Sequence, residues 1–105
     1  MGKHDPDIEI NEVRVVNYTQ PSYSGTGANR VGSTLVTIRL EFSDGSNMDD
    51  WVQFDNINVT THKYLEYNVG IYVVTIRVTV TTEGTNNNMN ITGATADIDS
   101  KTVIH

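Results

Sequence analysis

The sequence predicts an all-β protein whose antiparallel strands, about seven in number, form two sheets packed as a sandwich. The first observation is residues 69–82, in which apolar and polar side chains alternate with a period of two, the pattern of a strand with one buried face. The second is composition: 22 Val and Ile stand against three Leu and three Ala, beside 14 Thr. β-Branched residues favour strands. A chain of 105 residues forms one core, and a single strand needs a second apolar layer.

The N-terminal part predicts an arm, a strand and a long loop. Residues 1–7 are polar and contain Pro6, so we expect a loose or docked arm before a single domain at 8–105. The phase of alternation changes between Ile10 and Val13, which indicates a bulge or a strand that crosses between sheets. Residues 19–32 hold Pro21 and three glycines and predict a loop. Its Tyr23 and Arg30 are candidate partner contacts, whereas the elements of a phosphate-binding loop are missing.

Strict alternation over residues 34–42 predicts a second strand, and Asp44-Gly45 predicts the turn that folds the chain back. Residues 51–54 form the returning strand. We expect its Trp51 to pack in the core, because one indole covers a large area between two sheets. The alternative is an exposed anchor for a partner.

The second half predicts a short strand, the central strand and a last strand. After a turn at Asp55, residues 57–59 suggest the short strand, residues 60–68 lead to the central strand, and residues 83–88 form a polar turn. The last strand begins at Met89, with a bulge near Gly93. Val103 and Ile104 are apolar at the end of the sequence. They are either the end of a paired edge strand or a surface that another subunit covers.

Two short motifs resemble those of a known family. His62-Lys63-Tyr64, then Gly70 to Ile76, is similar to the His-x-Tyr and Gly-x-Tyr-x-Val-Thr motifs of PKD domains, which are immunoglobulin-like sandwiches. Residues 41–46 resemble the Asp-Phe-Gly-Asp-Gly-Ser turn of that family. The match covers residues 40–74, with Leu40 where the family has Trp and Ser43 where it has Gly.

The resemblance allows two registers. In one, Leu40 occupies the strand C position; in the other, residues 34–42 are strand B, Trp51 is the strand C tryptophan, and the Asp-Gly turn joins B to C. The resemblance places His62, Tyr64, Gly70 and Tyr72 at fold-defining positions, and in the second register it places Trp51 at one as well. Tyr72 follows a glycine as in a tyrosine corner, whose hydroxyl bonds to nearby backbone.

Composition excludes several partners and cofactors. A net charge of −6 with scattered Lys and Arg argues against nucleic acid. No apolar run reaches the roughly 20 residues that span a bilayer, and the N-terminus lacks the apolar segment of a secretory signal. The absence of cysteine excludes disulfides and thiolate zinc sites. We expect no cofactor.

Candidate chemistry is limited to a calcium site. Hard oxygen ligands come from the turn and from the strand after it, and calcium needs six to eight of them. The candidates are Asp44, Asn47, Asp49, Asp50 and Asp55. His4, His62 and His105 lie far apart in the sequence and in no catalytic motif, so we expect no enzyme.

These observations lead to two functional hypotheses. The first is a structural protein of a virus particle, a phage capsid decoration or tail-surface domain of immunoglobulin-like fold, bound to capsid or tail subunits or to copies of itself. We expect edge strands and long loops to make these contacts. The alternative is a PKD-like adhesion or carbohydrate-associated module of a longer secreted or cell-surface protein. Fold analogy separates them only weakly.

Overall fold

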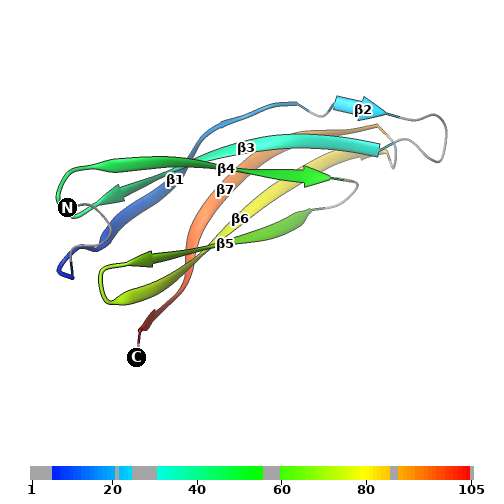
Figure 1. Ribbon diagram of the computed structural model, residues 1–105. Helices are drawn as coiled ribbons and strands as arrows, with labels where there is room; N and C mark the ends of the chain where they lie inside the picture. Colours follow the sequence, from blue (N-terminus) through cyan, green and yellow to red (C-terminus); the bar gives the residue numbers. More distant parts are fainter. Residues whose placement is uncertain (1–5, 21, 25–30, 56–59, 86–87, 105) are drawn as a thin grey trace.

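The computed structural model describes residues 6–20, 22–24, 31–55, 60–85 and 88–104. These residues are all-β, as expected, and they form antiparallel strands in two sheets (Figure 1). The strands are β1 (Ile10–Tyr18), β2 (Ser22–Ser24), β3 (Val31–Phe42), β4 (Asn47–Asp55), β5 (Thr61–Val69), β6 (Tyr72–Thr85) and β7 (Asn88–Val103).

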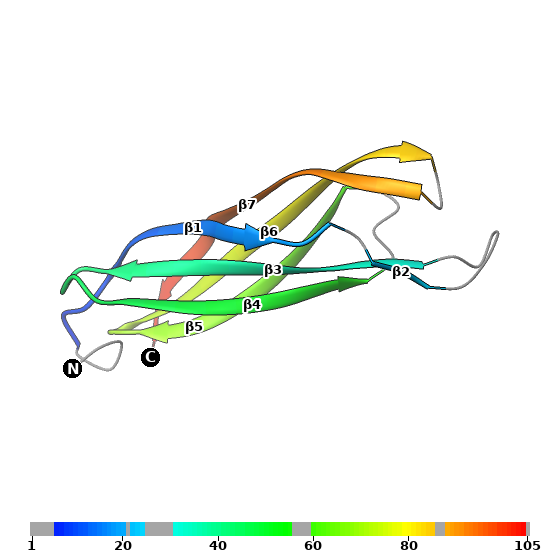
Figure 2. The same ribbon diagram turned by 90° about the horizontal axis from the view of Figure 1, so that it is seen from above.

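Each sheet is built from strands that follow one another in the chain. In the first, sheet A, β3 is central: β4 pairs along one edge, and β1 and β2 pair one after the other along the remaining edge. In the second, sheet B, the order is β5-β6-β7. Figure 2 shows the strands of sheet B running at an angle across those of sheet A.

This pairing differs from both registers of the immunoglobulin resemblance. In an immunoglobulin sandwich, strands B and C belong to different sheets and strand C pairs with strand F. Here the Asp44-Gly45 turn joins two neighbours within sheet A, and β6, the F-like strand, pairs with β5 and β7. Alternation along a strand specifies which of its faces is buried, but it does not specify which strand pairs with it. The sequence pattern alone therefore could not exclude immunoglobulin-like pairing.

The two sheets share one apolar core. Alternate residues of the two central strands, β3 and β6, are almost fully buried, as the alternation in residues 69–82 predicted. Phe54 of β4 and Ile91 of β7 join the same cluster. At the other end of the sequence, Ile8 is also buried within it. The buried apolar residues of the central strands are Val36, Ile38, Leu40 and Phe42 of β3 and Val74, Ile76, Val78 and Val80 of β6.

The central strand is shifted relative to its predicted limits. Val69 ends β5, Gly70 and Ile71 form the turn, and β6 begins at Tyr72. Gly70 has φ +59°, a left-handed conformation that suits glycine. At its far end β6 extends through Glu83 and Gly84, which were expected in a turn. The predicted strand at 57–59 falls outside the described residues, and residues 61–68 belong to β5.

One turn and two bulges lie where the sequence predicts them. Gly45 has φ +87°, and its N–H donates to the Phe42 carbonyl, which confirms the turn there. The β1–β3 register shifts between Ile10 and Glu12, where the alternation changes phase. The β6–β7 register shifts next to Gly93, so a bulge near this glycine is confirmed.

Polar side chains join the sheets where their edges meet. Between the end of β1 and β7, the Gln20 side chain donates from Nε2 to the Ile91 carbonyl at 3.2 Å and accepts the Ile91 N–H on Oε1 at 3.3 Å. Gln20 therefore occupies both backbone groups of one β7 residue, as a neighbouring strand does. Further along the same side, Lys101 Nζ of β7 lies 3.1 Å from Glu9 Oε1.

We predict that Gln20→Ala lowers the free energy of unfolding by about 1–3 kcal/mol, because two hydrogen bonds are lost and Ile91 loses a partner for both backbone groups. Urea denaturation measures the difference. Gln53→Ala is the matched control, since the Gln53 side chain is exposed and its hydrogen bond in the described structure is to Asp55, on its own strand. Equal stability of the wild type and Gln20→Ala would contradict this role.

Candidate contact surfaces

An apolar surface lies at the end of sheet B where the β5–β6 turn meets the C-terminal part of β7. Ile71, Val103 and Ile104 are 46%, 47% and 45% exposed. Val103 pairs with Tyr72, and Ile104 N–H donates to the Ile71 carbonyl at 2.7 Å. We call these three residues the apolar end of sheet B. Val103 thus ends the paired edge strand β7 and Ile104 follows it, and both still present apolar side chains to solvent.

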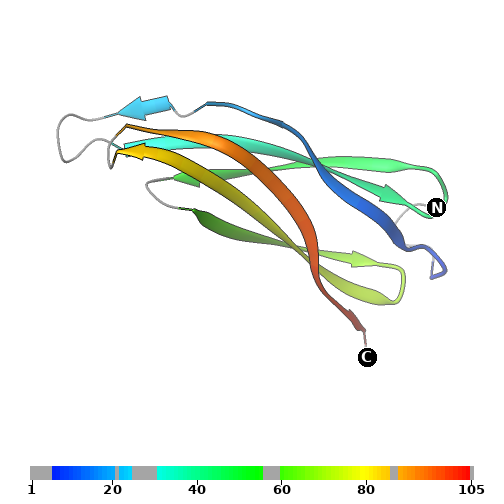
Figure 3. The same ribbon diagram turned by 180° about the vertical axis from the view of Figure 1, so that it is seen from behind.

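The apolar end lies where the sheets separate. Figure 3 shows β6 and β7 curving away from sheet A toward the C-terminus. There Lys101 reaches back to Glu9, and its Nζ also lies 4.4 Å from the centre of the Tyr72 ring. The Tyr72 hydroxyl has no hydrogen-bond partner among the described residues, so the expected tyrosine corner is wrong. The Tyr72 ring instead makes a cation–π contact with the Lys101 ammonium.

Trp51 lies on the outer face of sheet A, and its expected place in the core is wrong. The side chain is 60% exposed. Val52 and Phe54 point into the core, and because alternate residues of a strand face opposite sides, Trp51 points outward. Across the ladder it pairs with Thr37. The sequence contained this information, since Trp51 and Phe54 are three positions apart and an odd difference places two strand residues on opposite faces.

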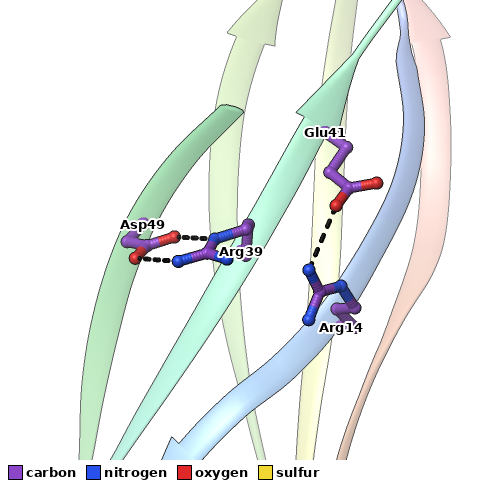
Figure 4. A network of polar contacts seen from close by, with 4 residues as sticks. All are labelled: Arg14, Arg39, Glu41 and Asp49. Carbon is purple, nitrogen blue, oxygen red and sulfur yellow. Dashed lines mark hydrogen bonds and ion pairs between the residues drawn. The ribbon is translucent and has the colours of Figure 1, made fainter. Parts of the chain in front are cut away.

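Two ion pairs lie on the outer face of sheet A (Figure 4), and Asp49 of one pair is two residues before Trp51 on the same face of β4. Arg39 donates from Nε and Nη2 to the two carboxylate oxygens of Asp49 at 2.6 and 2.9 Å, and Arg14 donates to Glu41 at 3.2 Å. The Arg39 hydrogen bonds lower the pKa of Asp49, and the same bonds raise the pKa of Arg39. Because Arg14 and Arg39 are directly opposite in the ladder, the two carboxylates offset their repulsion.

The calcium candidates do not converge. Asp44 accepts the Ser46 N–H and hydroxyl, which lowers the pKa of Asp44. Asp55 lies at the far end of β4, about 27 Å from Asn47 at roughly 3.4 Å per residue. Between them, Asp49 and Asp50 point to opposite faces. Across the described ranges, no group of three or more His, Cys, Asp or Glu residues could hold a metal ion.

Asp50 joins β4 to β5 instead. The Tyr67 hydroxyl donates to Asp50 Oδ2 at 2.6 Å, and Asp50 Oδ1 accepts the Trp51 N–H at 2.8 Å. Nearby, Lys63 Nζ donates to the Gln53 carbonyl at 2.7 Å. The inward-facing carboxylate of Asp50 therefore binds a backbone N–H of edge strand β4, and the Lys63 ammonium binds one of its carbonyls. Burial, and next the hydrogen bond to Asp50, raise the pKa of Tyr67 well above its ordinary value.

The remaining candidates are separate from these surfaces. Tyr23 is in β2, opposite Gly32, so part of the predicted loop is a strand; Arg30 lies outside the described residues. On the outer face of sheet B, His62 Nδ1 lies 2.7 Å from Thr79 Oγ1, and exposed Tyr64 pairs with Arg77. His62 and Tyr64 thus contribute to cross-strand pairs. His4 and His105 are outside the described residues.

Comparison with protein-family models, with curated proteins and with solved structures finds no match. In the part of the chain that the structure describes, there is no helix whose length and apolar character would allow it to cross a membrane. Gln20, Lys101 and Ile71 are the important residues that sequence reasoning missed. Their roles depend on contacts between distant segments, for which no local pattern gives a signal.

We predict that stability falls above about pH 10 partly because of Tyr67. Its pKa is raised in the folded state above the ordinary value of about 10, so this stabilisation is complete below pH 10 and is lost as the pH rises toward the folded pKa. The free energy of unfolding, measured at about pH 9 and about pH 11, should fall less in Tyr67→Phe than in the wild type. Tyr64→Phe, at an exposed site, should behave as the wild type. An unchanged pH dependence in Tyr67→Phe would contradict the assignment.

Proposed function

We propose that the protein is a non-enzymatic structural protein that acts by protein–protein contact, as a surface component of a virus particle. The observation that supports contact is the apolar end of sheet B. Its three side chains are nearly half exposed, although backbone pairing holds all three residues in place. Exposed apolar groups that are close together are typical of interaction sites. Residues already fixed by the fold lose little conformational entropy on binding.

Contact through side chains fits the structure better than strand addition. Lys63 occupies the Gln53 carbonyl on edge strand β4, and Gln20 occupies both backbone groups of Ile91 on edge strand β7. A strand added at either place must displace these groups. Inward-facing charges such as Asp50 are a common protection of sheet edges. The apolar end has no such cover among the described residues.

The virus-particle setting is supported by the sequence. Outward positions of β6 and β7 are rich in threonine, and the His62 and Gly70 motifs resemble PKD-like and immunoglobulin-like domains. The proposal does not assume that the protein belongs to the immunoglobulin family, because consecutive strands pair within each sheet and the immunoglobulin strand order is absent from the described strands. The contact proposal uses only the two-sheet architecture and the exposed residues.

We predict that the double variant Ile71→Ser, Ile104→Ser binds its particle at least tenfold more weakly, since a loss of about 1.4 kcal/mol is tenfold in affinity and apolar interface anchors exceed this value. The measurement is co-sedimentation of purified protein with virus particles from the producing culture. Electron microscopy of the pellet should show a regularly spaced surface density.

Tyr64→Ser is the matched control, because it removes an exposed apolar side chain from another part of sheet B. It should sediment as the wild type does. Wild-type protein that stays in the supernatant with every particle preparation would contradict the proposal. Binding to whole cells in place of particles would favour the cell-surface adhesion alternative.

A further inference from the structure

Trp51 is the centre of a second exposed surface, far along sheet A and independent of the apolar end. Leu35 pairs with Gln53, and Thr37 pairs with Trp51, so Leu35 and Trp51 are diagonal neighbours on one face. Leu35 is 40% exposed and Trp51 is 60% exposed. We call Trp51, Leu35, Thr37 and Gln53 the Trp51 platform. The core does not need these apolar groups, because the inner positions of β3 and β4 supply it.

The area of the platform is small for a protein partner. A tryptophan side chain buries at most about 250 Å², so an indole that is 60% exposed offers about 150 Å². Leu35 adds a smaller area. Protein–protein interfaces bury roughly 800 Å² on each partner around an apolar centre. The platform therefore matches one or two rings of a small ligand better than it matches a second protein.

The polar groups next to the indole are uncharged, and the charged groups beyond them on this face are already hydrogen-bonded. On one side along the strands, Arg39 commits Nε and Nη2 to Asp49, and beyond it Arg14 is paired with Glu41. An ionic ligand would have to compete with these carboxylates and guanidinium groups. Immediately around Trp51 lie the hydroxyl of Thr37 and the amide of Gln53, which carry no net charge. Gln53 Nε2 donates to the Asp55 carboxylate at 2.9 Å, so Gln53 offers its Oε1 to a ligand as an acceptor.

A third amide lies in the same cross-strand row. Asn17 of β1 pairs with Thr37, which pairs with Trp51, and Asn17 is exposed. Two strand spacings of about 4.8 Å place Asn17 about 10 Å from Trp51. An extended ligand that covers the indole can therefore reach the Asn17 amide across Thr37. The row combines one flat apolar surface with hydrogen-bonding groups on one side.

We propose that the Trp51 platform binds neutral oligosaccharides, with one sugar ring stacked on the indole. One face of a pyranose ring carries mainly C–H groups, which suit an aromatic face, and its rim carries hydroxyls, which suit the hydroxyl and amides of Thr37, Gln53 and Asn17. The site is open and contains one aromatic ring, so we expect a dissociation constant on the order of 1 mM. This binding uses a different surface from the proposed particle contact and does not depend on it.

The fluorescence of Trp51 tests the proposal directly, because it is the only tryptophan in the chain. The protein is titrated to about 10 mM with hexasaccharides of β-1,4-linked glucose, N-acetylglucosamine and mannose, and with an acidic hyaluronate hexasaccharide. We expect a saturable change in Trp51 emission with at least one neutral sugar and weaker binding of the acidic one. No saturable change with any neutral sugar, or tighter binding of hyaluronate, would overturn the proposal.

Variants locate the site. In calorimetry, Trp51→Ala should reduce affinity at least tenfold, while Trp51→Tyr, which keeps an aromatic ring and serves if the alanine variant unfolds, should retain binding within about fivefold. Tyr64→Ala removes an exposed aromatic ring from sheet B and should bind as the wild type does. The double variant Ile71→Ser, Ile104→Ser should also bind normally, which separates this proposal from particle contact. Wild-type affinity in folded Trp51→Ala would place binding elsewhere and overturn the assignment.

Discussion

The apolar layer shared by β3 and β6 is the constraint on which the rest of the structure depends. Each strand buries every second side chain against the opposite sheet. The buried row of β6 is entirely Val and Ile, and that of β3 combines Val36 and Ile38 with Leu40 and Phe42. A buried Val or Ile contributes about 1.5–3 kcal/mol relative to an exposed one, so this layer supplies the largest favourable term of the fold. Because the central strands cross face to face, the edge strands come together in two places, and polar side chains join the sheets there.

Those junctions explain why charged and amide side chains lie beside an apolar core. Tyr67 and Asp50 join β5 to β4, and Gln20 joins the end of β1 to Ile91. Each contact satisfies a polar group that the approach of two sheets would otherwise remove from water. The same side chains cover backbone groups of edge strands, so one set of residues both joins the sheets and limits unwanted strand pairing. The outer faces and the apolar end are then the surfaces left for partners.

The faces of the strands could be predicted from sequence, and their neighbours could not. Val74, Ile76 and Val78 alternate with threonine and arginine, and this period alone identifies the buried side. The same period is satisfied whether β3 lies beside β4, as it does, or beside another strand. The prediction for Trp51 is wrong for a different reason: size and apolarity favour the core, but Val52 and Phe54 are the core-facing residues of this strand and Trp51 has the opposite phase. Gln20 and Lys101 act across long sequence separations, for which no local pattern exists.

The most direct test of this account is the pattern of nuclear Overhauser effects between β3 and β6 in solution. Face-to-face packing predicts contacts between methyl groups of Ile38 or Leu40 and those of Ile76 or Val78, with no backbone contacts between the two strands, since packed sheets lie about 10 Å apart and paired strands about 4.8 Å apart. Backbone amide and Hα contacts between β3 and β6 would show that the strands are hydrogen-bonded neighbours, as in an immunoglobulin sheet, and would contradict the architecture described above.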